Sequence, residues 1–268
     1  MEIYDKVYEA YEGFWRGPAE TYSYFKLKQT LAGLVKTELQ LNSKPRILDV
    51  GCGIGTDLNM LSVDGITGEF WGMDISRVAI KRANELAKKR DERNFYWVVA
   101  SAEHLPIRDD AVDIIISSEV IEHLRNPLAF LFEVKRVLKR KGVIVLTTPN
   151  PDYLLGKIFR CFPKKMKDAL DKEQQWHLKR VSPKLSLSKW EEGHVSVMSL
   201  DNWKKLVEKA GLKIDKIRGS AIFGGHAWLD KHGLALGIMI VIDSLISALI
   251  HFSKHLHFNL IIKARKVG

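Results

Sequence analysis

Residues 47–55, Ile-Leu-Asp-Val-Gly-Cys-Gly-Ile-Gly, constrain the fold most, because three glycines directly follow a short apolar run. The run Ile47–Val50 is typical of a buried strand, and a helical pattern begins at about Thr56. Glycines let the chain turn sharply from strand to helix and let backbone N–H groups approach a ligand. The segment therefore predicts a strand, a ligand-binding turn and a helix.

The rest of the chain alternates between short apolar runs and helical patterns. Helices are expected after the N-caps Ser76 and Asn126, the second with Gly142 as its stop, and over residues 199–210. This alternation predicts an α/β fold with a parallel sheet covered on both faces. The expected strands are 46–50, 70–73, 95–99, 112–117, 143–147, 213–218 and 258–266.

Two kinds of segment depart from this alternation. Residues 1–43 predict an N-terminal helical cover, interrupted at Gly17-Pro18, and residues 44–268 form the main domain. Within that domain we expect insertions at about 152–190 and 219–257. Ten Lys/Arg and three acids lie between Lys157 and Lys189, a large share of the formal net charge of +10. Such a segment is either a solvated face or a surface for nucleic acid, anionic lipid or an acidic substrate.

Cysteine usage and the first residues bear on the compartment. The two cysteines, Cys52 and Cys161, give neither a disulfide framework nor a CxxC metal signature, which favours a reducing compartment. The segment that starts at Met1 lacks the basic-then-apolar order of a secretory signal. We therefore expect a cytoplasmic protein.

Residues 233–252 form an apolar run about as long as a bilayer is thick. Asp243 lies at its centre, where a carboxylate in lipid is unfavourable. Asp243, Ser247 and His251 recur every four residues, which indicates a polar stripe along one side of a helix. The run also separates two strands that we expect in one sheet. We therefore expect a helix that packs on the protein or covers the site as a lid. The alternative is a helix that lies in the membrane interface, and a helix that crosses the membrane is not expected.

Two acids beside the glycine turn indicate which ligand it binds. A dinucleotide-binding turn would have glycine or alanine at position 56, where this chain has threonine. Asp49, inside the strand, suits the ammonium of an amino-acid moiety better than a pyrophosphate. The following helix favours an anion at its N-terminus, here the ligand's carboxylate. Asp74 ends the next strand and can accept both hydroxyls of a ribose, and Ile75 can cover an adenine.

Residues 47–150 resemble the class I S-adenosylmethionine-dependent methyltransferases, and among them the type 11 and ubiquinone-biosynthesis O-methyltransferases. The resemblance implies a Rossmann-like, seven-stranded sheet with helices on both faces and the last strand antiparallel. It implies S-adenosyl-L-methionine as cofactor. The blocks that carry it are the glycine motif, Gly72–Ile75, Ala100–Pro106, Val112–Leu124 and Arg136–Asn150. The cofactor-binding residues that follow from the turn and the resemblance are Asp49, Gly51, Gly53, Gly55, Asp74, Ile75, Ala102, Glu103 and Ser118.

A Glu-x-x-Glu-His motif follows the fourth expected strand. Ubiquinone-pathway O-methyltransferases and small-RNA 2′-O-methyltransferases share this motif and bind a divalent metal with it and a later histidine. The resemblance therefore implies Glu119, Glu122, His123 and His194 as metal ligands. A metal on the acceptor hydroxyl would lower its pKa and hold its oxygen for attack. The alternative is that Glu122 and His123 only cap a turn, and without metal His123 is the candidate catalytic base.

Together these features predict an S-adenosylmethionine-dependent methyltransferase that methylates the oxygen of a small or lipophilic acceptor. Peripheral membrane contact through residues 233–252 fits a lipophilic acceptor. One alternative is an RNA 2′-O-methyltransferase, although the basic insertion has few aromatic residues among its charges, which disfavours nucleic acid. The other alternative is a non-catalytic subunit that binds the cofactor and activates a partner.

Overall fold

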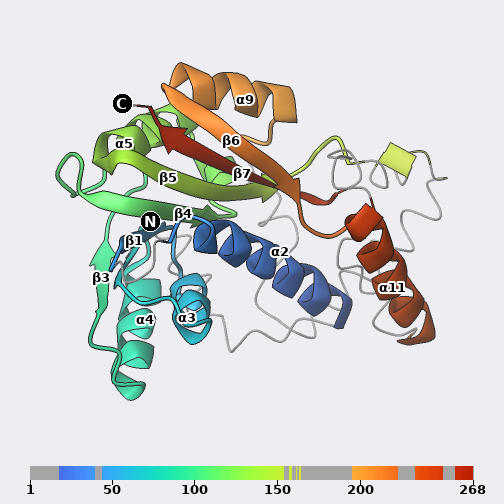
Figure 1. Cartoon of the computed structure of the whole chain (residues 1–268), viewed down its shortest axis with the longest axis horizontal. Coiled ribbons are helices and arrows are strands. Elements are labelled where there is room, and N and C mark those ends of the chain that lie inside the picture. Colours follow the sequence, from blue (N-terminus) through green and yellow to red (C-terminus); the bar gives the residue numbers. More distant parts are fainter. Residues whose placement is uncertain are drawn as a thin grey trace.

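The computed structural model describes residues 18–39, 44–153, 157–158, 161, 163, 195–222, 233–249 and 257–267. Seven strands form one sheet in the order β3-β2-β1-β4-β5-β7-β6 (Figure 1). Strands β1 to β5 pair in parallel, and β7 pairs antiparallel with both β5 and β6. The expected sheet, with its antiparallel last strand, is confirmed. The strands are β1 Arg46–Val50, β2 Glu69–Asp74, β3 Phe95–Val99, β4 Val112–Ser118, β5 Leu138–Pro149, β6 Leu212–Gly219 and β7 Asn259–Lys266.

Helices cover both faces of this sheet (Figure 1). On one face lie α2 (Pro18–Lys36), α3 (Thr56–Val63) and α4 (Arg77–Lys89). On the other face lie α5 (Pro127–Val137) and α9 (Leu200–Lys209), which bury the large Trp203 side chain. A short 3₁₀ helix, η1 (Ile121–His123), follows β4, and α11 (Gly233–Leu249) lies at one end of the molecule.

The alternation of side chains along β1 decides which helices meet the site. Ile47 packs in the cluster under α2 and α3, whereas Leu48 and Val50 pack in the cluster under α5 and α9. Because successive side chains in a strand point to opposite faces, Asp49 shares the face of Ile47. The first acid of the glycine motif therefore points toward α2 and α3.

Two helices begin at the N-caps that the sequence indicates, Ser76 and Asn126, and the helix expected from Ser199 begins at Leu200 with Ser199 as its N-cap. The side chains of Ser76, Asn126 and Ser199 each accept a backbone N–H bond from three residues further on. The predicted stop at Gly142 is wrong, because α5 already ends at Val137.

The early end of α5 follows from strand pairing. Leu138 pairs with Val112, and the next pair is Val143 with Ile114, so residues 139–142 bulge out of β5. Lys141 takes a left-handed conformation within this bulge, with φ 67°. Buried Leu138 thus belongs to the sheet, whereas a helix that stopped at Gly142 would have included it.

The segments outside the regular alternation are described only in part. Helix α2 begins at Pro18, where the sequence pattern breaks, and the residues before it lie outside the described part. Most of the 152–190 insertion also lies outside it, and the 219–257 insertion contains α11. Within the ranges given above, no helix combines the length and apolarity that crossing a bilayer requires.

Candidate active site

The glycine turn lies at the carboxyl end of β1. All three glycines have left-handed backbones, with φ of 78° at Gly51, 52° at Gly53 and 83° at Gly55. A Cβ at Gly51 would overlap Val120, and a Cβ at Gly55 would overlap the Trp97 ring. Both backbone conformation and packing therefore require glycine at Gly51 and Gly55.

Asp74 links the glycine turn to the end of β2. One of its carboxylate oxygens accepts the N–H of Gly53 and the other accepts the N–H of Ser76, each at 2.8 Å. These two bonds fix the orientation of the carboxylate. A carboxylate held in this orientation at the end of a strand is a suitable acceptor for ligand hydroxyls. Ile75 follows directly and is half-buried.

Asp49 is buried at the end of β1, with 1% of its surface exposed. Its Oδ1 accepts no hydrogen bond from any described residue. Burial raises its pKa well above the ordinary value of 3.8, and the negative charge of Asp57 raises it further. A buried carboxylate without a partner is unfavourable. Asp49 therefore provides a place where a ligand cation would be stabilised.

Lys28 reaches the same region from α2. Its Nζ lies 2.6 Å from the carboxylate of Asp57 and donates to Ser118 Oγ at 2.9 Å. Burial lowers the pKa of Lys28, but the charges of Asp57, Tyr24 and Asp49 and the hydrogen bond to Asp57 together outweigh burial, and the pKa is raised overall. An ammonium has three N–H donors, and these two partners leave one for a ligand. Sequence reasoning missed Lys28 and Asp57, since nothing in the sequence pairs residues of two separate helices.

The carboxyl end of β4 carries Ser118 and Glu119. Ser118 Oγ lies 3.2 Å from Thr147 Oγ1, which donates to Glu119 at 2.7 Å. Asn259 of β7 donates to the other Glu119 oxygen at 2.9 Å. Glu119 has φ 57°, which is uncommon for a residue other than glycine and is typical of functional sites. β5 and β7 thus hold Glu119 in place.

The two residues expected beside an adenine lie after β3. Ala102 packs partly buried against the core formed with α5 and α9. The Glu103 carboxylate accepts the backbone N–H of Asn126 at 2.9 Å, which places it next to the start of α5. Their contact with a cofactor stays a prediction.

The predicted metal centre receives no support from the described residues. They contain no group of three or more His, Cys, Asp or Glu side chains placed to hold a metal ion. Glu119 is bound by Thr147 and Asn259, as described above. Glu122 is fully buried, and burial together with the charge of Glu119 raises its pKa to about 9. His194 lies outside the described residues, and its role as a ligand stays a prediction.

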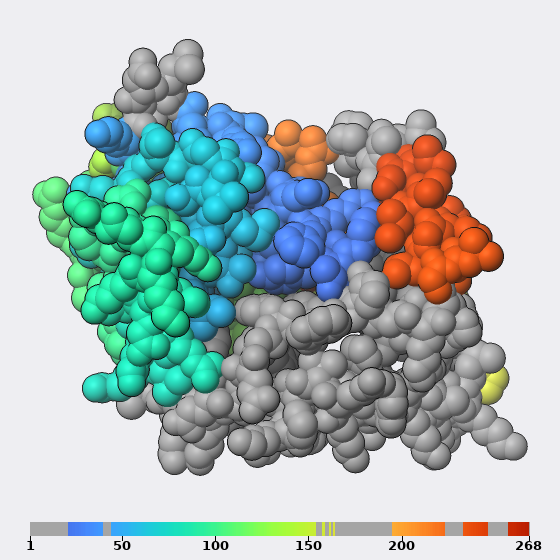
Figure 2. Space-filling model, turned by 90° about the horizontal axis from the view of Figure 1, so that it is seen from below, coloured from blue at the N-terminus to red at the C-terminus, as the bar shows by residue number. Residues whose placement is uncertain are grey.

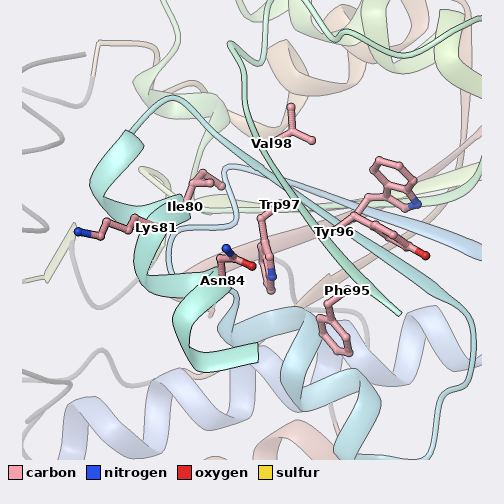
Figure 3. Close-up of a pocket in the computed structure, with 8 residues that line it drawn as sticks. Ile80, Lys81, Asn84, Phe95, Tyr96, Trp97 and Val98 are labelled. Atoms are coloured by element: carbon pink, nitrogen blue, oxygen red, sulfur yellow. The ribbon is translucent and has the colours of Figure 1, made fainter. Parts of the chain in front are cut away.

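A separate pocket of about 420 Å³ lies between α4 and the edge strand β3 (Figure 3). Trp97 and Phe95 point to one side of β3 in Figure 3, and Val98 points to the other. Because the Trp97 ring also packs against Gly55, it separates this pocket from the glycine turn. None of the predicted site residues lines the pocket. Its lining is Trp71, Ile80, Lys81, Asn84, Phe95, Tyr96, Trp97 and Val98.

Comparison with known proteins gives the family. A family model described as a methyltransferase domain matches residues 41–211, which is more than half of the chain. An uncharacterised protein of Methanocaldococcus jannaschii is 32% identical over 130 residues, 48% of this chain and 56% of its own length. A malonyl-[acyl-carrier protein] O-methyltransferase of Paenibacillus is 28% identical over 188 residues. That match covers 67% of this chain and 66% of the relative. The chain thus spans less than two thirds of the length of both relatives.

Solved structures agree on the fold. The Haloferax volcanii complex between the methyltransferase activator Trm112 and a protein described as a methyltransferase gives a TM-score of 0.61 at 16% identity. It covers 100% of this chain and 97% of that one. Phosphoethanolamine N-methyltransferase 2 of Haemonchus contortus, solved with S-adenosyl-L-methionine, gives a TM-score of 0.61 at 15% identity. That match covers 98% of this chain and 57% of the matched chain.

The chain therefore belongs to the methyltransferase domain family, and its sheet is that of the class I S-adenosylmethionine-dependent methyltransferases. The family's cofactor is S-adenosyl-L-methionine.

Proposed function

We propose that this chain transfers the methyl group of S-adenosyl-L-methionine to a small acceptor, and that the glycine turn holds the cofactor. The observation that carries the proposal is buried Asp49, whose Oδ1 accepts no hydrogen bond from a described residue, beside a turn with glycine at three positions. The cofactor's ammonium would donate the hydrogen bond that this oxygen lacks. Asp74, with its orientation fixed by Gly53 and Ser76, would accept the ribose hydroxyls.

The charges around the turn also suit this cofactor. Two further buried acids, Asp57 and Asp74, lie close enough to Asp49 to raise its pKa, and the buried lysine beside Asp49 is Lys28, which pairs with Asp57. The ligand brings an ammonium and a sulfonium against one carboxylate, so a net negative site favours it. In this proposal the third N–H of Lys28 binds the carboxylate. Methyl transfer removes the sulfonium charge, which weakens the attraction and favours product release.

The chemistry is an in-line displacement, in which the acceptor's lone pair forms the new bond to the methyl carbon. The electrons of the broken carbon–sulfur bond stay on sulfur, and the acceptor oxygen gives up its proton. The main task of the protein is to hold acceptor, methyl group and sulfur collinear. His123, in η1 after β4, lies beyond the carboxyl end of the strands, where open α/β sheets bind ligands. We propose that it accepts the proton.

Oxygen on a lipophilic molecule is the acceptor we propose. The support is the resemblance to O-methyltransferases, the name of the Paenibacillus relative, and the apolar α11 beside the domain. A lipophilic acceptor would be met at a membrane surface. The RNA alternative rests on the basic insertion, most of which lies outside the described residues, and on the Glu-x-x-Glu-His motif. The Haloferax complex with an activator is compatible with the scaffold alternative but adds no observation on this chain.

The test uses cofactor labelled with ¹³C in its methyl group, incubated with the purified chain and separate panels of hydroxylated lipids and generic RNA. We expect the label in a lipid fraction, with the chemical shift of an O-methyl group. Asp74→Ala abolishes incorporation, whereas Asp64→Asn, at an exposed position after α3, leaves it unchanged. Label in RNA, or on nitrogen, overturns the acceptor proposal. Calorimetry that detects no cofactor binding overturns the methyltransferase proposal itself.

A further inference from the structure

Helix α11 packs against the rest of the protein through a polar contact. Asp243, at the middle of the helix, is fully buried. It accepts a hydrogen bond from Tyr22 Oη at 2.6 Å and forms an ion pair with Lys26, both on α2. Its other carboxylate oxygen accepts the backbone N–H of Ile222 at 2.6 Å. The side of α11 that carries Asp243 therefore faces α2.

The opposite side of α11 is apolar and exposed. A helix turns by about 100° per residue, so Leu234, nine residues before Asp243, lies on the opposite side of the helix from Asp243. The molecule seen from below in Figure 2 has α11 at its outer edge, beside α2. The exposed aliphatic side chains, which we call the outer face, are Leu234, Ile238, Val241, Ile242 and Leu245, exposed by 38% to 83%.

A helix on the surface of a water-soluble protein buries its apolar side and exposes its polar side. In α11 the carboxylate of Asp243 is buried and the aliphatic side chains are exposed. A contiguous exposed apolar patch marks an interaction site. We infer that the outer face docks on an anionic lipid bilayer, with α11 lying in the plane of the membrane surface. Asp243 then fixes the rotation of the helix so that its apolar side is presented to the lipid.

Charge selects the bilayer over a second copy of the chain. The formal net charge of +10 attracts an anionic surface and makes two copies repel each other. In the sequence, Asp230 and Lys231 precede the apolar run and Lys254 follows it. A positive balance of charge beside an apolar segment is typical of helices that bind membrane interfaces.

The connections of α11 favour a flat orientation. The chain leaves the sheet at Gly219 and returns at Asn259, and Gly219 pairs with Leu260 in the antiparallel β6–β7 ladder. Both ends of the excursion therefore meet the same edge of the sheet. Since Asp243 is also bound to α2, a crossing of the bilayer would have to break its contacts.

The inference rests on the proposed function in one respect, that docking would deliver a lipid-borne acceptor. Vesicle binding itself needs no methyl transfer and is tested separately. The experiment is co-sedimentation of the full chain with vesicles of phosphatidylcholine and phosphatidylglycerol in equal parts, or of phosphatidylcholine alone. We expect binding to the mixed vesicles that weakens with salt, and about tenfold or more weaker binding to the neutral ones.

The decisive variant is Ile238→Asp, and the matched control is Val63→Asp, which places the same charge at an 80% exposed aliphatic position on α3. Ile238→Asp reduces binding by about tenfold or more, and Val63→Asp leaves it nearly unchanged. The double variant Leu234→Ser/Ile238→Ser, which adds no charge, also loses binding. Calorimetric cofactor affinity stays the same in all of them, so failure here is distinct from failure of the proposed function.

Two results overturn the inference. One is equal vesicle binding by wild type, Ile238→Asp and Val63→Asp, or no binding by any of them. The other is a dimer, seen by light scattering, that Ile238→Asp dissociates, because a second copy then covers the outer face.

Discussion

Lys28 on α2 and Asp57 at the start of α3 form a buried ion pair, with Nζ 2.6 Å from the carboxylate, although 29 residues separate them in the sequence. The pair brings the only helix described before the glycine motif to the edge of the turn. It also places a cation next to Asp49 and Ser118. Helix α2 therefore contributes to the proposed cofactor site as well as covering the sheet.

Lys28→Met leaves Asp57 buried without its cation. We expect a loss of about 3 kcal/mol in the free energy of unfolding, measured with urea. We also expect cofactor affinity to fall by about tenfold or more, because the ligand carboxylate loses its charge-assisted partner. Lys28→Met/Asp57→Leu recovers most of the stability without recovering affinity. Unchanged affinity in the single variant would remove Lys28 from the proposed site.

The variant Asp49→Asn tests the buried carboxylate of Asp49 through the pH dependence of the free energy of unfolding. The pKa of Asp49 is raised in the folded chain, so the folded state keeps a proton that the unfolded chain releases above about pH 4. The free energy of unfolding therefore falls as the pH rises from about 4 to the raised pKa of Asp49 in the folded chain. The variant removes this slope and stabilises the cofactor-free protein at neutral pH. A wild-type profile that rises over this window would contradict the assignment.

The same group makes cofactor binding pH-dependent. The cofactor's ammonium stabilises the ionised form of Asp49, so binding releases a proton, and affinity rises with pH up to the raised pKa. Titration calorimetry in two buffers of different ionisation enthalpy measures the proton released. Asp49→Asn binds more weakly and releases none. Proton release that persists in the variant would point to another group.

Gly55→Ala tests the packing of the turn against Trp97. Gly55 and Gly65 have nearly equal φ, 83° and 84°, but a Cβ at Gly65 meets nothing within 4 Å. Gly65→Ala thus measures the backbone strain alone, about 1 kcal/mol. Gly55→Ala adds overlap with the Trp97 ring, and we expect a further loss of about 2 kcal/mol in urea unfolding. Equal losses in the two variants would show that the ring moves aside easily.

His123→Gln tests the proposed base. The maximal rate of methyl transfer should fall by about 100-fold, while cofactor affinity should stay within a factor of about two, because the base acts on the acceptor. His104→Gln, at an exposed histidine before α5, is the matched control and keeps the rate. A full rate in His123→Gln would leave positioning of the acceptor as the main source of catalysis.

The sheet could be predicted from local pattern because each of its signals is local. The apolar runs Arg46–Val50 and Phe95–Val99 are strands with the bounds expected of them, and the caps at Ser76 and Asn126 begin helices. The stop at Gly142 failed because pairing of Leu138 with Val112 outweighed helix propensity.

The contacts that complete the site depend on tertiary structure. No pattern relates Lys28 to Asp57, or Asp243 to Tyr22. Periodicity placed Asp243 on the polar side of a helix, but it could not say whether that side faces water or protein. The structure shows that it faces α2. A buried ion pair or anchor of this kind is visible only once the helices are packed.

The most direct test of the proposed cofactor site is a crystal structure of the chain with S-adenosylhomocysteine, the product of methyl transfer. We expect the ligand across the glycine turn, with its ammonium hydrogen-bonded to Asp49 and its ribose hydroxyls to Asp74. We also expect its carboxylate to contact Lys28. Density for the ligand in the pocket beside α4, or a dinucleotide with its pyrophosphate in the turn, would overturn the proposed site.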